Sequence, residues 1–401
     1  MKLFSLNDFP IRNKTILVRV DYNVPLKKGK VIDSTKIKAS LPTIHYLLQK
    51  NCKIILMTHL GRPKGKTISN LKTKVLIKEI KKILPKLKIT SLNSCIGQEV
   101  RDKIQQGKGK EIFLLENLRF YKEEKENDSV FAHSLADLAD FYINDAFGVS
   151  HRKHASVNAI TKFIPSAYGF LLSKEINQLS KVLKPKKPLT WIIGGAKLDK
   201  VDLIKNSLKK ADYIIIGGAL AFSFLKAKGY GVGMSKIDSK SVRIAKKILR
   251  NRNSKKIVLP IDVIVSSTSS SGVKPEVVPV NRIPINKIGF DIGPKTIKLF
   301  SDYLKKSKTI VWNGPLGYFE NEKFQKGTKS ITNLLSKLSA VTIIGGGETS
   351  EAIHKFKLTK RMTHISTGGG ASLEFLTGKK LPAIKALEKN YKSFKRKIEV
   401  K

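Results

Sequence analysis

The sequence predicts an α/β protein made of two doubly wound parallel-sheet, Rossmann-like domains joined by a hinge helix. Three observations lead to this fold class. Short apolar runs alternate with stretches of helical spacing, the second half of the chain repeats the plan of the first, and one amphipathic stretch at 170–183 separates the halves before Pro185 and Pro188. Strands buried on both faces of a parallel sheet are short and almost continuously apolar, and helices connect them.

The first half of the chain contains four apolar runs that we expect to be buried strands. They span residues 15–22, 53–59, 111–117 and 140–147. Between these runs, apolar side chains recur with the spacing of one helix face. The two clearest sets are Ile44, Leu47 and Leu48, and Val75, Ile77, Ile80 and Ile83. Alternation of this kind predicts right-handed strand–helix–strand units in a parallel sheet.

In the second half, four apolar or β-branched runs end in consecutive glycines. These runs are TWIIGG (190–195), YIIIGG (213–218), VTIIGGG (341–347) and THISTGGG (363–370). Glycine at the carboxyl end of a parallel strand lets backbone N–H groups approach a phosphate, and the next helix offers its positive end. Glycine also serves in ordinary tight turns, but four such turns in one half predict a nucleotide-binding cleft.

The length of 401 residues fits two or three domains. We expect an N-terminal domain at 1–169, the interdomain helix at 170–184, a nucleotide-binding domain at 185–378, and a tail at 379–401 that packs back on the N-terminal domain. The segment SSTSSSG (266–272) is expected to be a surface loop. The sequence contains no run of about 20 apolar residues, the length that a membrane helix needs.

The first residues, MKLFSLNDFP, are charged and polar where a signal peptide needs an apolar block. The chain has only two cysteines, Cys52 and Cys95, which exclude a disulfide framework and a four-cysteine metal site. Both observations indicate a cytoplasmic protein.

The formal net charge is +46, from 77 Lys and Arg against 31 Asp and Glu. The lysines are spread along the chain, whereas a nucleic-acid-binding protein more often gathers its cations into one stripe or arm. We therefore interpret them mainly as solvated surface residues that keep the protein monomeric and steer anionic ligands inward. A basic nucleic-acid-binding protein remains the alternative, with no specific nucleic acid expected.

Polar clusters follow each predicted strand of the first half. Their members are Asp21 and Asn23, His59 and Arg62, Arg119, and His151, Arg152 and His154. Side chains at the carboxyl ends of parallel strands converge on one crevice, and guanidinium groups bind phosphate and carboxylate in bidentate fashion. The pattern predicts a site for a compact phosphorylated anion. Taken singly, each residue is equally well a surface residue or a cap, and His151 with His154 would be a zinc pair only with a third ligand.

In the second half, Lys197 and Lys200 follow Gly194 and Gly195, where lysines neutralise nucleotide phosphates. Asn313 and Glu320 lie in the turn segment VWNGPLGYFE, and such a carboxylate either binds a ribose or stabilises the turn. Glu348 follows three glycines. It is a candidate Mg²⁺ ligand because magnesium prefers oxygen, although an acid in a first helical turn also stabilises a helix without metal.

A series of longer motifs runs between residue 19 and residue 376. These motifs are RVDYNVP, LMTHLGRP, LLENLRF, NDAFG followed by HRKH, GGAK, IIGGALAF, VWNGPLGYFE, IIGGGET and STGGGASLEFL. In their order and extent they resemble the signature series of the phosphoglycerate kinase family, over nearly the whole chain. The resemblance implies reversible phosphoryl transfer between 1,3-bisphosphoglycerate and ADP, giving 3-phosphoglycerate and ATP, in glycolysis and gluconeogenesis.

The resemblance also implies a role for particular residues. The residues that would bind 3-phosphoglycerate are Asp21, Asn23, Lys36, His59, Arg62, Arg119 and Arg152. Those that would bind the magnesium nucleotide are Lys197, Lys200, Asn313, Glu320, Gly345, Gly346, Gly347, Glu348 and Thr349, with Gly217 and Gly218 along the adenine pocket and Glu348 on the metal. The catalytic set would be Lys36, Lys197, Gly346 and Gly369, the last within a hinge-point segment at 366–370. Transfer in this family is direct and in line, on domain closure.

Three features of this chain depart from the family pattern. Lys36 stands where the family has an arginine that stabilises the transferred phosphoryl group, and Glu348 stands in place of an aspartate at the magnesium position. The segment GGAKLDK is one residue shorter than the family pattern between its two lysines. Since lysine and glutamate preserve the charges, we expect an active enzyme. The alternative is a kinase-like scaffold with impaired catalysis.

Overall fold

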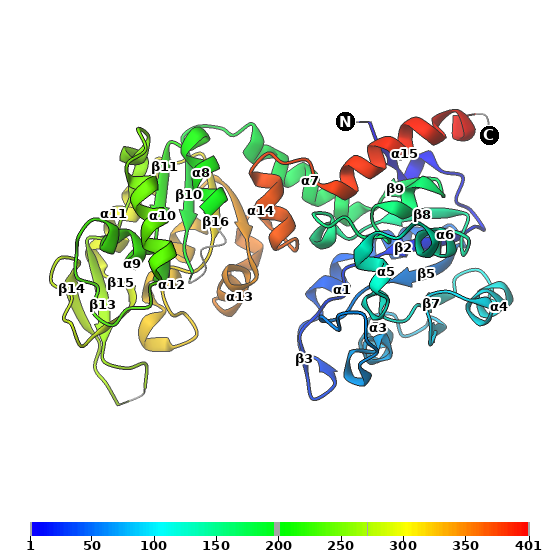
Figure 1. Ribbon diagram of the computed structural model, residues 1–401, viewed down its shortest axis with the longest axis horizontal. Helices are drawn as coiled ribbons and strands as arrows, with labels where there is room; N and C mark the ends of the chain where they lie inside the picture. The colour runs from blue at the N-terminus through cyan, green and yellow to red at the C-terminus, as the bar shows by residue number, and fades with distance from the viewer. Residues whose placement is uncertain (1, 196–200, 271, 400–401) are drawn as a thin grey trace. The chain divides into compact units, whose positions relative to one another are not determined.

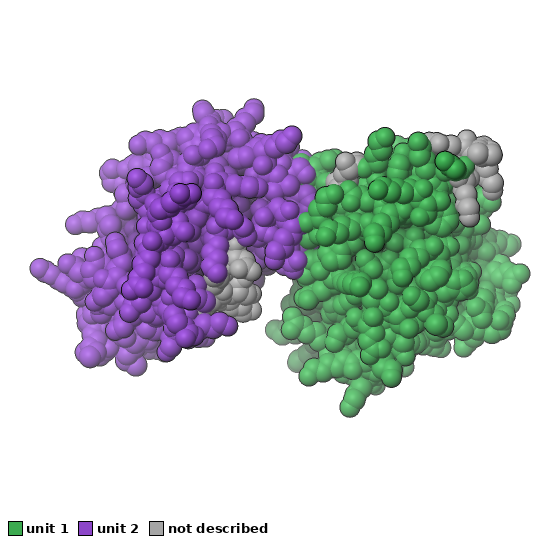
Figure 2. All heavy atoms as spheres, turned by 45° about the horizontal axis from the view of Figure 1, so that its top comes forward, with its two compact units in different colours: residues 1–177, 380–401 green, residues 178–379 purple. Residues whose placement is uncertain are grey.

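The computed structural model describes residues 2–195, 201–270 and 272–399. The chain divides into two compact units, which Figure 2 shows in different colours. Unit 1 comprises Met1–Asn177 and Lys380–Lys401, and unit 2 comprises Gln178–Lys379. The boundary falls inside helix α7 (Phe170–Leu183), whose bounds equal those of the amphipathic stretch in the sequence. Each unit is described by itself below.

The described part of unit 1 contains a seven-stranded sheet with the order β1-β9-β8-β2-β5-β7-β6, and every pairing in it is parallel. Its strands are β1 (Phe4–Ser5), β2 (Thr15–Arg19), β5 (Lys53–Met57), β6 (Ile89–Ser91), β7 (Ile112–Leu114), β8 (Phe141–Asn144) and β9 (Ser166–Tyr168). A short antiparallel hairpin joins β3 (Leu26–Lys27) to β4 (Lys30–Val31).

The helices of unit 1 alternate with its strands, and two of them lie where the sequence predicts helical spacing. They are α1 (Thr35–Ala39), α2 (Leu41–Gln49), α3 (Ile77–Ile83), α4 (Gln98–Gln106), α5 (Lys122–Glu126), α6 (Ser129–Ala136), the first part of α7, and α15 (Pro382–Glu399). Both faces of the sheet are covered. On β2, Ile16 and Val18 belong to one core cluster, whereas Leu17 belongs to another on the opposite face. Burial on both faces explains the continuous apolar run of this strand.

The described part of unit 2 contains a six-stranded parallel sheet with the order β12-β11-β10-β16-β17-β18. Its strands are β10 (Leu189–Ile193), β11 (Tyr213–Ile216), β12 (Ile257–Val258), β16 (Thr309–Asn313), β17 (Val341–Gly345) and β18 (His364–Ile365). A separate antiparallel sheet has the order β14-β13-β15. It consists of β13 (Asp262–Ser266), β14 (Glu276–Pro279) and β15 (Ile288–Ile292).

The helices of unit 2 connect these strands, as the labels in Figure 1 allow the reader to follow. They are α8 (Val201–Lys210), α9 (Gly218–Ala227), α10 (Ser239–Leu249), α11 (Pro294–Lys305), α12 (Lys326–Leu335), α13 (Gly347–Lys355) and α14 (Gly370–Leu376). The two parallel sheets with their helices confirm the predicted α/β class. The antiparallel sheet, in contrast, was not predicted, because only a small-residue loop was recognised in this region.

The C-terminal helix α15 packs on unit 1, beside β9 (Figure 1). Tyr391 and Phe394 contact the core cluster that includes Phe4, and the rings of Phe4 and Tyr391 lie 4.7 Å apart. Asn390 is buried, and its amide nitrogen donates to the backbone carbonyls of Thr161 and Ile164. Helix α15 thus belongs to the same core as Phe4. No helix in the described residues is long and apolar enough to cross a membrane.

Candidate functional site

The polar residues predicted in the first half lie at one edge of the unit 1 sheet. Apart from Lys36, each follows the carboxyl end of β2, β5, β7 or β8, and parallel neighbours end at the same edge. We call this set the unit 1 polar edge. It comprises Asp21, Asn23, Lys36, His59, Arg62, Arg119 and Arg152. Lys36 comes not from a strand end but from the short helix α1.

Lys36 and Asp21 form an ion pair at this edge. Lys36 Nζ lies 2.8 Å from Asp21 Oδ2, with the aspartate side chain 9% exposed and the lysine side chain 31% exposed. The other oxygen, Asp21 Oδ1, accepts a hydrogen bond from the backbone N–H of Asn23 at 3.3 Å. The carboxylate therefore holds the lysine at the edge of the sheet while the ammonium remains partly open to solvent.

The turn after β5 is fixed by two other members of the edge. Asn23 Oδ1 accepts from the backbone N–H of Gly61 at 2.9 Å, and Arg119 Nη1 donates to the carbonyl of Gly61 at 2.8 Å. Gly61 has φ +65°, a conformation that side-chain-bearing residues rarely adopt. Arg62, the next residue, is exposed. The exposed Arg62 side chain therefore follows a glycine whose N–H and carbonyl groups are both hydrogen-bonded.

Arg119 lies in the 3₁₀ helix η4 (Leu118–Phe120) and is half-buried. Burial, together with the nearby positive charge of Arg19, lowers the pKa of its guanidinium to about 10. The group is still cationic at neutral pH. Among the groups that act on it electrostatically are Asp21 and Arg152, which places all three in one cluster.

His59 is 2% exposed and follows β5 by two residues. Burial lowers its pKa well below the usual range of histidine, so the ring is neutral at physiological pH. Neighbouring basic groups act in the same direction, namely Arg19, Arg119, Lys36 and His154. Sequence reasoning missed Arg19, which is 1% exposed at the end of β2. The available signal was a lone arginine inside the apolar run TILVRVDY.

The segment after β8 carries the remaining predicted residues. Arg152 is exposed, and burial lowers the pKa of His151 to about 4. His154 Nδ1 lies 3.7 Å from Glu124 Oε1. Within the ranges that the structure describes, no three His, Cys, Asp or Glu side chains are grouped so as to hold a metal ion. The histidine pair therefore has no third ligand there.

The glycine turns of the second half lie at one edge of the unit 2 sheet, which we call the unit 2 glycine edge. It comprises the turns that follow β10, β11, β16, β17 and β18. The register aligns Ile193, Asn313 and Gly345 across neighbouring parallel strands, so the turns after them emerge side by side. Helices α9 and α13 begin directly at two of these turns, and the first N–H groups of a helix favour an anion. In α9, however, the N–H groups of Gly218 and Leu220 already donate to the carbonyls of Leu316 and Gly195.

Asn313 ends β16 and faces the turn at Gly346. Its side chain is 2% exposed, and its Nδ2 is buried with no hydrogen-bond partner among the described residues. A Cβ atom placed on Gly346 would lie 2.9 Å from that nitrogen, and Gly346 has φ +91°. The turn thus requires glycine for both reasons. A buried, unpaired donor is costly unless something accepts from it.

Gly217 and Gly218 form the turn between β11 and α9. Gly218 has φ +59°, and a Cβ atom there would lie 2.6 Å from the backbone nitrogen of Gly195. The two glycine turns after β10 and β11 are therefore in close contact. Gly369, at the start of α14, also has positive φ, at +49°. Ser366 Oγ accepts from the N–H of Gly368 at 3.1 Å and bonds to Ser372 Oγ.

The other predicted nucleotide residues differ in exposure. Glu320 and Glu348 are exposed, the latter in the first turn of α13. Thr349 is buried, and its Oγ1 accepts from the backbone N–H of Gly314 at 2.7 Å, which joins α13 to the turn after β16. Lys197 and Lys200 lie outside the described residues.

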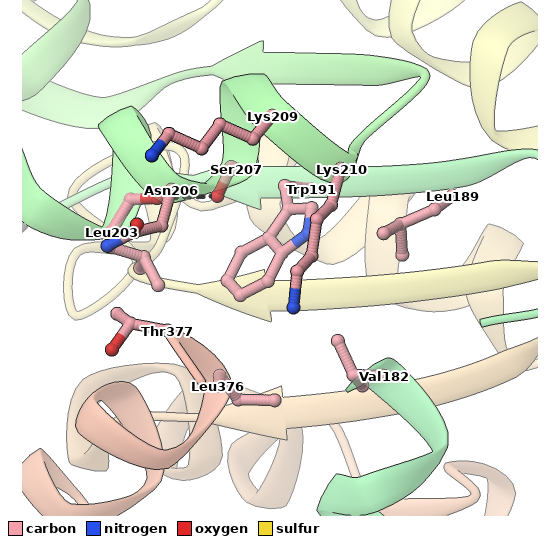
Figure 3. Close-up of a pocket in the computed structure, with 10 residues that line it drawn as sticks. All are labelled: Val182, Leu189, Trp191, Leu203, Asn206, Ser207, Lys209, Lys210, Leu376 and Thr377. Atoms are coloured by element: carbon pink, nitrogen blue, oxygen red, sulfur yellow. Dashed lines mark hydrogen bonds between the residues drawn. The ribbon is translucent and has the colours of Figure 1, made fainter. Parts of the chain in front are cut away.

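A cavity of about 40 Å³ lies between α7, β10, α8 and α14 in unit 2 (Figure 3). Its lining includes Val182, Leu189, Trp191 and Lys210, and Trp191 Nε1 has no partner among the described residues. The volume suits one or two water molecules, whereas nucleotide-sized ligands occupy hundreds of cubic ångströms. A larger groove of about 560 Å³ is lined by the cations Lys226, Arg243, Lys246, Lys247 and Arg250.

The chain is similar to known proteins over nearly its whole length. The family model described as "Phosphoglycerate kinase" matches residues 6–379. The phosphoglycerate kinase of Finegoldia magna is 46% identical over 389 residues, covering 96% of this chain and 98% of the relative. The structure of the phosphoglycerate kinase from Pyrococcus horikoshii OT3 matches with a TM-score of 0.87 at 32% identity, covering 98% of this chain and 100% of that one. The one from Coxiella burnetii gives a TM-score of 0.85 at 35% identity, covering 97% and 99%. This chain belongs to the phosphoglycerate kinase family.

Proposed function

We propose that the unit 1 polar edge binds 3-phosphoglycerate or 1,3-bisphosphoglycerate and that the unit 2 glycine edge binds the magnesium nucleotide. As a phosphoglycerate kinase, the protein is a phosphotransferase with a carboxyl group as acceptor, active in glycolysis. One observation carries the assignment of the edges. The predicted anion-binding side chains of unit 1 follow the ends of neighbouring parallel strands, and the glycine turns of unit 2 do the same on its sheet.

On the substrate side, the cations suit an anion with a carboxyl group and a phosphate. Arg62 and Arg152 are exposed at the edge, and each guanidinium grips an anion through two parallel hydrogen bonds. Arg119 is tied to the turn carbonyl of Gly61 through one nitrogen, which leaves its other donors for a ligand. Asp21 and Asn23 then serve to orient Lys36 and the turn after β5.

On the nucleotide side, the turn after β17 leads straight into α13. The positive end of this helix and its first N–H groups favour a phosphate. The buried amide nitrogen of Asn313 next to Gly346 would find its missing acceptor in a phosphate oxygen. Gly217 and Gly218 have no side chains to obstruct a base, and Glu320 is exposed and available to a ribose hydroxyl. Lys197 and Lys200 are proposed as phosphate ligands from the family resemblance alone.

Members of this family use a magnesium nucleotide. Glu348 fits a magnesium ligand because its carboxylate is exposed in the first turn of α13, directly after Gly345–Gly347. When bound, magnesium would neutralise charge on the nucleotide phosphates. The glutamate itself would hold the metal through one oxygen or through a bound water, since its side chain is one methylene longer than the aspartate of the family pattern.

In the transfer step, a carboxyl oxygen of 3-phosphoglycerate and a β-phosphate oxygen of ADP occupy opposite ends of the moving phosphoryl group. Such transfer relies on positioning and on charge neutralisation. We assign the charge neutralisation to Lys36, and Asp21 holds its ammonium group in place. The turns at Gly346 and Gly369 would offer backbone N–H groups to the phosphoryl oxygens without side chains in the way. Transfer requires the ligands of the two units to be brought into line, with water excluded.

We also propose a cytoplasmic monomer. The net charge of +46 opposes association between copies of the chain. Cys52 and Cys95 are buried free thiols, which suits a reducing compartment. Size-exclusion chromatography with light scattering, at physiological and at high salt, tests whether the protein is a monomer. A mass of twice 44.7 kDa at both salts would contradict it.

A coupled assay with 3-phosphoglycerate and Mg-ATP tests the proposed function. Nucleotide-dependent turnover is expected, together with saturation by each substrate. Binding of both ligands without turnover would instead favour the kinase-like scaffold. Retention on DNA that falls with salt and does not respond to nucleotide would favour the nucleic-acid-binding alternative, for which the groove at Lys226 and Arg243 offers a surface.

A further inference from the structure

A network of buried, hydrogen-bonded polar groups lies beneath the unit 1 polar edge. It comprises Glu124, Ser156, Arg19 and His59, each no more than 2% exposed. These residues come from α5, the segment after β8, the end of β2 and the turn after β5. Buried charges persist only when they are paired and hydrogen-bonded.

The hydrogen bonds that run from Glu124 through Ser156 fix the guanidinium of Arg19. Glu124 accepts from Ser156 twice, from the hydroxyl to Oε1 at 2.7 Å and from the backbone N–H to Oε2 at 2.8 Å. The Ser156 Oγ in turn accepts from Arg19 Nε at 2.9 Å. A further nitrogen, Arg19 Nη1, donates to the carbonyl of Val20. Two of the three guanidinium nitrogens are thus committed, and the plane of the group is set.

The third nitrogen determines the state of His59. Arg19 Nη2 lies 3.2 Å from His59 Nδ1. A guanidinium group has only donors, so Nδ1 must accept and cannot carry a proton. A neutral imidazole carries one proton on one of its two nitrogens. The proton of His59 therefore lies on Nε2.

We propose that Arg19 is a positioning residue which, held by Ser156 and Glu124, keeps His59 as a neutral imidazole protonated on Nε2. His59 then meets the substrate anion as a directed hydrogen-bond donor without a charge. This inference rests on the proposed substrate role of the unit 1 polar edge. Its consequence is a division of labour, in which Arg62, Arg119 and Arg152 neutralise the anion and His59 sets its orientation.

The surroundings of His59 keep this state over a wide pH range. The charged and titratable groups that act on the ring are Arg19, Arg119, Lys36 and His154, and all of them oppose a second proton on it. Burial acts in the same direction. The ring is consequently expected to remain the same donor throughout the range in which the enzyme works.

Nitrogen-15 NMR on histidine-labelled full-length protein tests the state directly. The chain has seven histidines, and the signal of His59 is assigned by its loss in His59→Gln. We expect the unmodified protein to show a protonated Nε2 and an unprotonated Nδ1 between pH 5.5 and 8. A ring protonated on Nδ1, or on both nitrogens at pH 7, would overturn the inference.

Two substitutions, one of Arg19 and one of Ser156, test whether Arg19 sets the protonation state of His59. Arg19→Met removes the donor at similar length, and a mixture of the two neutral forms is then expected at His59. Ser156→Ala is the milder change, which keeps Arg19 but frees its Nε, and it should give a smaller shift in the same direction. An unchanged His59 spectrum in every variant that folds would overturn the positioning role.

Two substitutions of His59 test its role toward the substrate. The amide of Gln reaches the place of Nε2 and can donate, whereas the shorter Asn reaches only the place of Nδ1. His59→Gln is expected to keep the KM for 3-phosphoglycerate within several-fold. His59→Asn should raise it about 10- to 100-fold, the effect of losing one hydrogen bond to a charged group, with the KM for Mg-ATP unchanged. A larger effect of His59→Gln would overturn the inference. Equal and unchanged KM values would contradict the proposed substrate site instead, because the NMR result does not depend on substrate.

Discussion

Lys36 and Asp21 are joined across the unit 1 polar edge, with Lys36 Nζ 2.8 Å from Asp21 Oδ2. The two residues come from different elements, the helix α1 and the end of β2. The carboxylate restricts a flexible side chain whose ammonium would otherwise sample many positions. The pair thus compensates in part for the planar fork that an arginine would supply at this place.

Substitution of Lys36 tests its part in the transfer step. Lys36→Ala should lower kcat by about 10²- to 10³-fold and change the KM for nucleotide little, because the charge is needed for the transferring group. Lys36→Arg should keep most of the activity. Steady-state kinetics with both substrates measures this. The exposed Lys38→Ala on the same helix is the control. An unchanged kcat in Lys36→Ala would rule the role out.

Glu348→Gln tests the proposed magnesium ligand. The substitution removes the charge and keeps the shape, so we expect affinity for Mg-ADP to fall about tenfold while affinity for 3-phosphoglycerate stays the same. Isothermal titration calorimetry of each ligand provides the comparison. Glu351→Gln, exposed one turn along α13, is the matched control and should bind both ligands normally. Equal losses for both ligands would argue against a metal role.

Gly346→Ala tests the turn after β17. A residue with a side chain is strained at φ +91°, and its Cβ would press on Asn313 Nδ2 at 2.9 Å. We expect nucleotide affinity to fall roughly tenfold and the protein to be destabilised by about 1–2 kcal/mol. Thermal unfolding with and without Mg-ADP measures both effects. Gly231→Ala, in the same unit with open space around it, should change neither. Full nucleotide affinity in Gly346→Ala would refute this account of the turn.

The fourth prediction concerns Asp145, which accepts from the N–H groups of Leu171 and Leu172 at the start of α7. Burial raises the pKa of its carboxyl to about 7, although these hydrogen bonds and one from Thr43 act to lower it. In an unfolded chain the pKa is about 3.9. Between these values the native state holds the extra proton, so the free energy of unfolding should fall as pH rises from 4 to 7.

Asp145→Asn removes this titration while keeping an oxygen for the two N–H groups. Relative to the variant, the unmodified protein should lose on the order of 2–4 kcal/mol between pH 4.5 and 7.5. Urea unfolding followed by circular dichroism measures the loss, and hydrogen exchange at Leu171 and Leu172 localises it. The comparison isolates Asp145 even though burial also raises the pKa of Asp291 to about 7. The exposed Asp102→Asn is the control. A difference that does not vary with pH would refute the prediction.

The parallel sheets could be predicted because their strands are buried on both faces and leave an unbroken apolar run, as at Ile16, Leu17 and Val18. The antiparallel strands β13–β15 could not. Strand β14 has exposed positions, such as Val277 at 55% exposure, and no clear period, whereas the buried run of β13 is only five residues long and leads directly into the small-residue loop. Local pattern thus predicts an element best when its environment is the same along its length.

The strand ends predicted which residues gather at each edge, but not how they are paired. Arg19 and Ser156 are separated by 137 residues, and Asn23 and Gly61 by 38. Nothing in the spacing of a single sequence indicates such hydrogen bonds, since they depend on the turns that bring distant segments together. For the same reason the pairing of Lys36 with Asp21 is visible only in the structure, although the sequence points to both residues.

Helix α15 has a consequence for the synthesis of the chain. Because Tyr391 and Phe394 complete a core that begins at Phe4, unit 1 is interrupted in sequence by all of unit 2. A ribosome must therefore make all of unit 2 before unit 1 can finish folding. Until then the apolar surface around Phe4 is uncovered and open to wrong partners or to chaperones. A premature stop codon near residue 380 would consequently damage the half of the enzyme that was translated first.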